Sequence, residues 1–286
     1  MIIWLASYPK SGNTLLRSML AAYFFSKDGV YNFDLIKYIK QFPNIALFER
    51  LGIDIKNESE VIKNYIKVQE TFNNKKTVQF LKTHSYLFNI NNCGFTNLDN
   101  SLGAIYIVRD PRNVVTSFAN HSNITPDEAS KILINEIHMG GDLSESSISQ
   151  RTKVFTGTWG GNFNSWKSFK VQNRYLLIKY EDLIQEKEKT FVKVLNFIHR
   201  LDKSNPNINL NKIKNIIQST DFTLMKKLEK EIGFSESKLN KKTGQKIPFF
   251  NLGEKNDWKK ILNKKIQENI ESAFEKEMKE LGYLNS

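Results

Sequence analysis

The start of the chain constrains the fold more than any other stretch, because it reads as a strand, a tight turn and a helix in direct succession. Residues 1–6 (MIIWLA) have the length and composition of a buried strand, and apolar residues recur at helical spacing from Leu15 onward. The unpaired N–H groups and positive dipole end of such a helix attract an anion, and Gly12 lets the backbone approach a phosphate closely. This succession predicts an anion site at the first turn.

The side chains of the turn suit an anion as well, since Lys10 supplies a cation and Ser11, Asn13 and Thr14 supply polar groups. The loop differs from the G-x-x-x-x-G-K-[ST] loop of ATP-binding proteins, because its lysine precedes the glycine. A turn that merely joins a strand to a helix is the alternative interpretation.

Composition narrows the class of protein only in part. A length of 286 residues with 40% hydrophobic residues is enough for one large α/β domain or two small ones. The formal net charge of +12 suits an anionic partner, such as a nucleotide, an acidic glycan, a nucleic acid or a membrane surface, without choosing among them. The single cysteine, Cys93, excludes an internal disulfide, and with only four scattered histidines we expect no metal site.

The chain shows no sign of targeting to a membrane. No basic, signal-type segment precedes the first strand, and no apolar run approaches the roughly twenty residues that span a bilayer. We therefore expect a cytoplasmic protein without a membrane span.

Two further apolar runs end in residues that carry chemistry. Residues 77–81 read as a strand followed by K-T-H, and residues 103–108 read as a strand followed by Arg109. The carboxyl ends of parallel strands share one edge of an open α/β sheet, which is where ligands bind. We therefore expect the first turn, His84 and Arg109 to meet in one crevice; a structural histidine and a solvated arginine are the alternatives.

The periodicity of the remaining segments predicts their secondary structure. Helical spacing predicts helices over residues 33–49, 58–71 and 125–139. Residues 235–256 are rich in Lys, Ser, Asn and Gly with little periodicity, which predicts a mobile loop. Apolar residues recur every four positions over residues 258–278, a spacing that drifts by roughly 40° per step, so we expect this last helix to curve, to break or to be buried on two sides.

Five motifs in the chain resemble those of one enzyme family. S-Y-P-K-S-G-N-T at the first turn resembles the 5′-phosphosulfate loop of sulfotransferases that use 3′-phosphoadenosine 5′-phosphosulfate (PAPS). The other four motifs follow in the family's order: K-T-H at 82–84, R-D-P-R-N at 109–113, Y-E-D-L at 180–183 and T-x-F-x-x-M at 220–225. The resemblance implies an α/β fold with a central parallel sheet flanked by helices, a P-loop-like nucleotide site, and one domain over residues 1–286.

The resemblance also implies roles for individual residues. His84 is the implied general base, Lys82 contacts the transferring sulfuryl group, and Lys10 neutralises the leaving 5′-phosphate. The implied donor is PAPS without a metal, and the implied acceptor is an unidentified hydroxyl or amine on a small molecule or glycan, with no nucleic acid as partner. The residues implied to bind the donor are Lys10, Ser11, Gly12, Asn13, Thr14, Arg109, Ser117, Tyr180, Thr220, Phe222 and Gly253.

The chain departs from the family pattern at two places. The family's R-K-G-x-x-G-D-W-K motif keeps Gly253 and residues 257–259 here, but Asn251-Leu252 stands where the family has a phosphate-binding Arg-Lys pair, and Asn256 replaces the second glycine. Leu15 stands where many members stack a tryptophan on adenine. Both changes predict weaker donor binding. The cations that could replace the missing pair are Lys241, Lys242, Lys246 and Arg112.

Three other functions compete with sulfuryl transfer. A family member that binds the nucleotide but has lost turnover fits the altered 251–252 pair. An ATP-dependent phosphotransferase requires magnesium ligands and a Walker A lysine, and neither is evident. A nucleic-acid-binding protein rests on net charge alone, because no recognisable nucleic-acid-binding motif appears.

Overall fold

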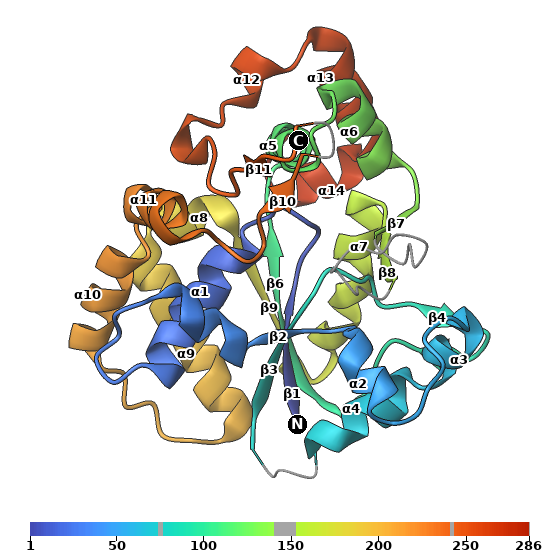
Figure 1. Cartoon of the computed structure of the whole chain (residues 1–286), viewed down its shortest axis with the longest axis vertical. Coiled ribbons are helices and arrows are strands. Elements are labelled where there is room, and N and C mark those ends of the chain that lie inside the picture. The colour runs from blue at the N-terminus through green and yellow to red at the C-terminus, as the bar shows by residue number, and fades with distance from the viewer. Residues whose placement is uncertain (74–76, 140–152, 241–242, 286) are drawn as a thin grey trace.

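A five-stranded parallel sheet forms the centre of the computed structural model, which describes residues 1–73, 77–139, 153–240 and 243–285 (Figure 1). The strand order is β2-β3-β1-β6-β9, and each neighbouring pair is parallel. The strands are β1 (Ile2–Ala6), β2 (Lys40–Gln41), β3 (Gln79–Thr83), β6 (Ser101–Val108) and β9 (Tyr175–Lys179). The predicted α/β fold with a central parallel sheet is confirmed.

Helices cover both faces of the sheet. Side chains alternate along a strand, so Ile3 and Leu5 enter one core while Trp4 and Ala6 enter the other. In Figure 1 one face is covered by α1 (Asn13–Phe25), α9 (Lys187–Asp202) and α10 (Leu210–Ser219), and the other by α2 (Ile45–Glu49), α4 (Tyr65–Asn73) and α7 (Trp159–Trp166). Burial on both faces explains why the strands read as continuous apolar runs.

A third group of helices lies beyond the carboxyl ends of the strands (Figure 1). It comprises α5 (Pro111–Ser122), α6 (Pro126–Ile134), α12 (Trp258–Ile261), α13 (Lys264–Ala273) and α14 (Glu275–Glu280). Asp110 caps α5 through the Arg112 amide, and Thr125 forms a capping box with Glu128 at the start of α6. The break expected in the last helix is confirmed, because three short helices replace one long one.

The remaining elements complete the chain between these layers. They are η1 (Phe33–Tyr38), α3 (Glu58–Lys63), β4 (Asn89–Ile90), β5 (Cys93–Gly94), β7 (Ile137–Met139), β8 (Val154–Gly157), η2 (Lys167–Asn173), α8 (Tyr180–Gln185), α11 (Phe222–Ile232), β10 (Lys238–Leu239), β11 (Lys246–Ile247) and η3 (Gly253–Lys255). Within the described ranges no helix is both long enough and apolar enough to cross a bilayer.

Two of the predicted helices are wrong in part, because strand pairing takes over. The segment predicted as a helix over residues 33–49 contains β2, which adds to the sheet edge; just beyond it the Phe42 amide donates to the Lys82 carbonyl at 2.8 Å. The helix predicted over residues 125–139 ends at Ile134, and β7 then pairs antiparallel with β8. Helical spacing in short segments does not reveal such partners.

The loop predicted over residues 235–256 is wrong in part, because the described residues there include the paired strands β10 and β11 and the turn η3. The Glu229 carboxylate on α11 anchors this segment from outside it. It accepts hydrogen bonds from the amides of Phe249 (2.7 Å) and Phe250 (2.9 Å) and from the hydroxyl of Ser237 (2.5 Å). These long-range bonds are invisible to local periodicity.

Candidate active site

A cavity of about 420 Å³ lies where β1, β3 and β6 end, and Lys10, His84 and Arg109, which follow these three strands, all line it. The crevice expected at this edge of the sheet is therefore present. The lining also includes Gly12, Asn13, Thr14, Lys82, Ser117, Tyr180, Thr220, Phe222 and Gly253. Ser11 lies beside them with its hydroxyl buried and without a hydrogen-bond partner in the described chain.

The loop between β1 and α1 has the backbone that an anion site requires. Gly12 adopts φ +98°, and a Cβ there would lie 2.3 Å from the Tyr180 ring, so only glycine fits. No side chain caps the first N–H groups of α1. The Asn13 amide donates to the Leu5 carbonyl (2.9 Å) and the Ser7 hydroxyl (3.2 Å), so this side chain fixes the loop to the end of β1.

The pKa of Lys10 is lowered into the neutral range. Burial lowers its pKa to about 7, and the nearby charges of Lys82, Lys238 and Arg109 act in the same direction, while Glu236 opposes them. Its Nζ lies 3.9 Å from the centre of the Phe249 ring. Near neutral pH this lysine is therefore only partly protonated, and an incoming anion would favour its charged form.

His84 is held as a neutral ring in a defined tautomer. Its Nδ1 lies 2.9 Å from the Ser7 carbonyl, which can only accept, so Nδ1 carries the proton and Nε2 keeps a free lone pair. The Asn162 amide donates to the His84 carbonyl at 2.9 Å and steadies the backbone. Burial, followed by the charge of Lys82, lowers the pKa of His84 to about 3.

Aromatic rings, those of Tyr180 and Phe222, also line the cavity. The Arg109 guanidinium lies 4.3 Å from the centre of the Tyr180 ring. A Cβ on Gly253 would come within 2.5 Å of the Phe222 ring, so the backbone there packs directly against that ring. The Thr220 hydroxyl donates to the Ile216 carbonyl at 2.7 Å, which ends α10 beside the cavity.

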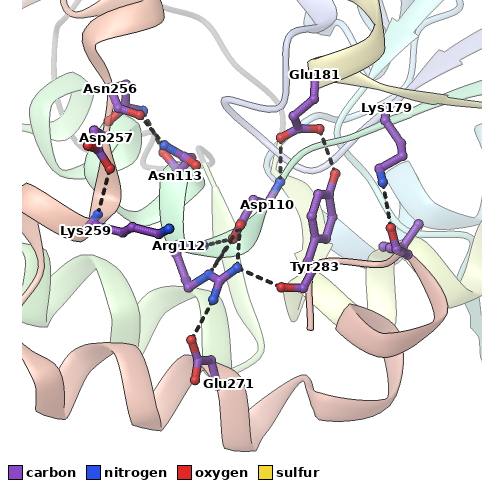
Figure 2. Close-up of polar contacts among 11 residues, drawn as sticks. Asp110, Arg112, Asn113, Lys179, Glu181, Asn256, Asp257, Lys259, Glu271 and Tyr283 are labelled. Carbon is purple, nitrogen blue, oxygen red and sulfur yellow. Dashed lines mark hydrogen bonds and ion pairs between the residues drawn. The ribbon is translucent and has the colours of Figure 1, made fainter. Parts of the chain in front are cut away.

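Arg112 does not replace the missing Arg-Lys pair, because other contacts hold it away from the cavity lining (Figure 2). Its guanidinium bonds Asp110 (2.7 Å), Glu271 (2.6 Å) and the Tyr283 carbonyl (2.9 Å). Lys246 lies on β11 and is not part of the lining. Lys241 and Lys242 lie outside the described residues.

Asn256, where the family has a glycine, ties the last third of the chain to α5. Its side-chain oxygen accepts from the Thr116 hydroxyl at 2.5 Å, and its amide donates to the Asn113 carbonyl at 3.0 Å. Figure 2 shows the two asparagine side chains facing each other. This departure from the motif therefore has a structural role in positioning the cavity wall.

The sequence did not reveal the acid at the centre of the site. Glu236 joins Arg17 (2.5 Å) and Lys82 (3.0 Å) through Oε1 and accepts from the Thr14 hydroxyl (3.1 Å) through Oε2. The one available signal was Arg17, a charged residue inside the apolar run L-L-R-S-M-L, which indicates a buried counter-ion. Its partner lies 219 residues away, in the segment predicted as a loop.

Further lining residues also lay outside the sequence-based site, among them His121, Lys187 and Lys238. His121 lies one helical turn beyond Ser117 on α5, and its ring meets the Phe249 ring edge-on at 5.7 Å. In the described ranges, no three His, Cys, Asp or Glu side chains gather closely enough to hold a metal ion.

A parallel sheet whose strand ends surround an uncapped helix N-terminus, two lysines, an arginine and a neutral histidine defines an α/β protein with a nucleotide-type anion site. The family is shown by comparison with known proteins. Residues 2–282 match the model of the sulfotransferase domain, and the chain belongs to the sulfotransferase family, a class of transferases.

Relatives and solved structures agree with this family. The mouse protein named Sulfotransferase 1 family member D1 is 24% identical over 97% of this chain and 83% of its own length. Human Sulfotransferase 1E1 is also 24% identical, over 96% of this chain and 83% of its own length.

Two solved structures share the fold at low identity. Mouse sulfotransferase SULT7A1 complexed with PAP superposes with a TM-score of 0.59 at 19% identity, over 99% of this chain and 86% of the other. Retinol dehydratase in complex with androsterone and the inactive cofactor PAP gives a TM-score of 0.56 at 13% identity, over 97% of this chain and 80% of the other.

Proposed function

We propose that this protein, as one domain over residues 1–286, transfers a sulfuryl group from PAPS to a hydroxyl or amine of a small-molecule or glycan acceptor. One observation carries the proposal: Lys10, Lys82, His84 and Arg109 converge on one cavity beside the uncapped start of α1. Structures of the same fold were solved with PAP, the 3′,5′-bisphosphate of adenosine that remains after transfer.

The residues present fit such a donor. The buried Ser11 hydroxyl without a partner and the free amides at the start of α1 would hold the 5′-phosphate, together with Gly12, Asn13 and Thr14. Arg109 and Ser117 would hold the 3′-phosphate, which distinguishes PAPS from ATP. The residues that would contact the adenosine are Tyr180, Thr220, Phe222 and Gly253.

His84 would act as the general base. The acceptor oxygen or nitrogen bonds to sulfur while the bond between sulfur and the 5′-phosphate oxygen breaks, and the acceptor proton passes to Nε2. The Nδ1 bond to the Ser7 carbonyl leaves the lone pair of the neutral ring on Nε2, and burial keeps the ring neutral until that moment. Lys82 would stabilise the charge spread over the sulfuryl oxygens, and Lys10 would offset the charge that develops on the leaving phosphate.

The proposal is tested by replacing the base and measuring binding and transfer separately. We expect His84→Ala to lower the transfer rate by about 100-fold or more while the affinity for PAP changes less than about threefold. His199→Ala, on α9 away from the cavity lining, is the matched control and should keep both. An active His84→Ala variant would remove His84 from this role.

The donor itself is tested by calorimetry with PAP, ADP and magnesium-ATP. Tighter binding of PAP than of the two controls supports the 3′-phosphate site, and Arg109→Ala should then weaken it by roughly 1.5–3 kcal/mol. Preference for magnesium-ATP would favour a phosphotransferase, and PAP binding without transfer to any acceptor would favour a member that has lost turnover. Salt-sensitive binding of random DNA without a nucleotide effect would favour a nucleic-acid-binding protein.

A further inference from the structure

Glu236 brings a negative charge into the centre of a site built for an anion. It precedes β10 and reaches the cavity, where its two carboxylate oxygens contact the side chains of Thr14, Arg17 and Lys82. Burial by itself would raise the pKa of Glu236, but Lys82 and Arg17 hold it well below its usual range, so the carboxylate is ionised.

The carboxylate joins the two halves of the proposed donor site. Thr14 belongs to the loop that would hold the 5′-phosphate, and its hydroxyl donates to Oε2 at 3.1 Å. Lys82 would contact the sulfuryl group, and its ammonium donates to Oε1 at 3.0 Å. Glu236 therefore makes the hydrogen bonds that the phosphosulfate would make from the same two side chains.

The same contacts cannot serve both anions at once. The Thr14 hydroxyl has a single proton to donate. Lys82 and Arg17 are buried, with side chains 6% and 7% exposed, so a counter-ion must lie beside them in the free protein. A phosphosulfate added next to Glu236 would face the repulsion of a like charge in a site of low dielectric constant.

Among the described residues that line the cavity, no other acidic side chain occupies the position between Thr14 and Lys82. The other acidic side chain, Asp221, caps α11 by accepting hydrogen bonds from the amides of Thr223 and Leu224. Glu229 lies behind the hairpin and accepts from Ser237, Phe249 and Phe250.

We propose that Glu236 is an internal competitor of the sulfuryl donor: its carboxylate occupies the anion position between Thr14 and Lys82 in the free protein, and the donor must displace it. The inference rests on the proposed donor site. Arg17 keeps Glu236 in this position. Its guanidinium forms an ion pair with the Glu236 carboxylate and donates hydrogen bonds to the carbonyls of Ile36 (3.0 Å) and Ile39 (2.7 Å).

The test compares Glu236→Gln with a matched loss of charge outside the cavity. Glutamine keeps the size of the side chain and removes its charge, so we expect Glu236→Gln to bind PAP about tenfold more tightly in calorimetry. Glu231→Gln, on the exposed end of α11, should stay within about twofold of the parent protein. Unchanged or weaker binding by Glu236→Gln would overturn the proposal and would instead assign Glu236 to holding Lys82 in place.

A second probe separates this inference from the proposed function. Inorganic sulfate requires only the anion position, so its addition should raise the melting temperature of Glu236→Gln more than that of the parent protein. An equal response overturns the inference. If sulfate stabilises Glu236→Gln more than the parent protein while no variant binds PAP more tightly than ADP, the donor assignment fails and the role of Glu236 as an internal anion stands. If PAP is bound more tightly than ADP but Glu236→Gln binds neither PAP nor sulfate better than the parent protein, the donor assignment stands and the inference fails.

A third measurement keeps Glu236 in place, should its replacement prevent folding. A fluorophore on Ser235→Cys, an exposed neighbour, in a Cys93→Ser background reports on the surroundings of the carboxylate. Displacement predicts a saturable change in emission with PAP and with inorganic sulfate. A label that responds to neither, in a protein that calorimetry shows to bind one of them, would contradict the displacement.

Discussion

The charge of Lys10 depends on pH in the neutral range, because burial lowers its pKa to about 7. An anion binds better to the charged lysine, so we expect the affinity for PAP to fall as the pH rises above about 7, by up to tenfold per unit. Below about pH 6 the phosphates themselves take up protons, which weakens binding on that side as well. Calorimetry in two buffers of different ionisation enthalpy should detect proton uptake at pH 8.

The matched control for this pH dependence is Lys10→Arg. A guanidinium stays charged over the whole range, so binding by this variant should be nearly constant between pH 7 and 9. An equally steep decline in both proteins would show that another group is responsible.

At this scale the sequence indicated the residues that follow the strands and missed the ion pairs of Glu236 with Arg17 and Lys82. Lys10, His84 and Arg109 each follow an apolar strand, and strand ends of a parallel sheet must meet. Glu236 lies 222 residues from Thr14, and nothing in its local sequence distinguishes it from the acids of a solvated surface. Only the folded chain shows which acid is buried.

Helix α5 carries Ser117, which the proposed function assigns to the 3′-phosphate, and its first turn is fixed to the last helices by Arg112 (Figure 2). The substitution Arg112→Met leaves the Asp110 carboxylate buried without the guanidinium, so we expect the free energy of unfolding to fall by about 3–5 kcal/mol. Lys260→Met, which removes an exposed ion pair with Asp257, should cost less than about 1 kcal/mol. Urea unfolding measures both, and equal stability of the two variants would refute the role of Arg112.

Among the elements, the long ones were predictable and the short ones were not. Helix α5 begins at Pro111 behind an Asp110 cap, a signal that is local and strong. Strands β2, β10 and β11 have two residues each, and each is defined by its pairing with a neighbouring strand. Propensity carries little information about such elements, since tertiary pairing decides them.

The residues that line the cavity come from nearly the whole length of the chain, from Pro9 to Asn256. We therefore expect a bound nucleotide to stabilise the entire fold. At a PAP concentration of about 100 times its dissociation constant, linkage adds about 2.7 kcal/mol to the free energy of unfolding. We expect the melting temperature to rise by roughly 4–5 °C. Calorimetric scans with PAP and with equal ADP make the comparison, and a larger shift with ADP would count against the 3′-phosphate site.

The two ends of the chain lie beyond opposite ends of the strands of the sheet (Figure 1). Met1 lies at the edge where the strands begin, whereas Tyr283 lies among the helices beyond the strand ends and bonds Glu181 at 2.8 Å and Arg112 through its carbonyl. A purification tag or reporter domain joined to the first residue is therefore held far from the cavity. One joined after the last helices starts beside the contacts that position α5, so fusions for binding studies belong at the amino terminus.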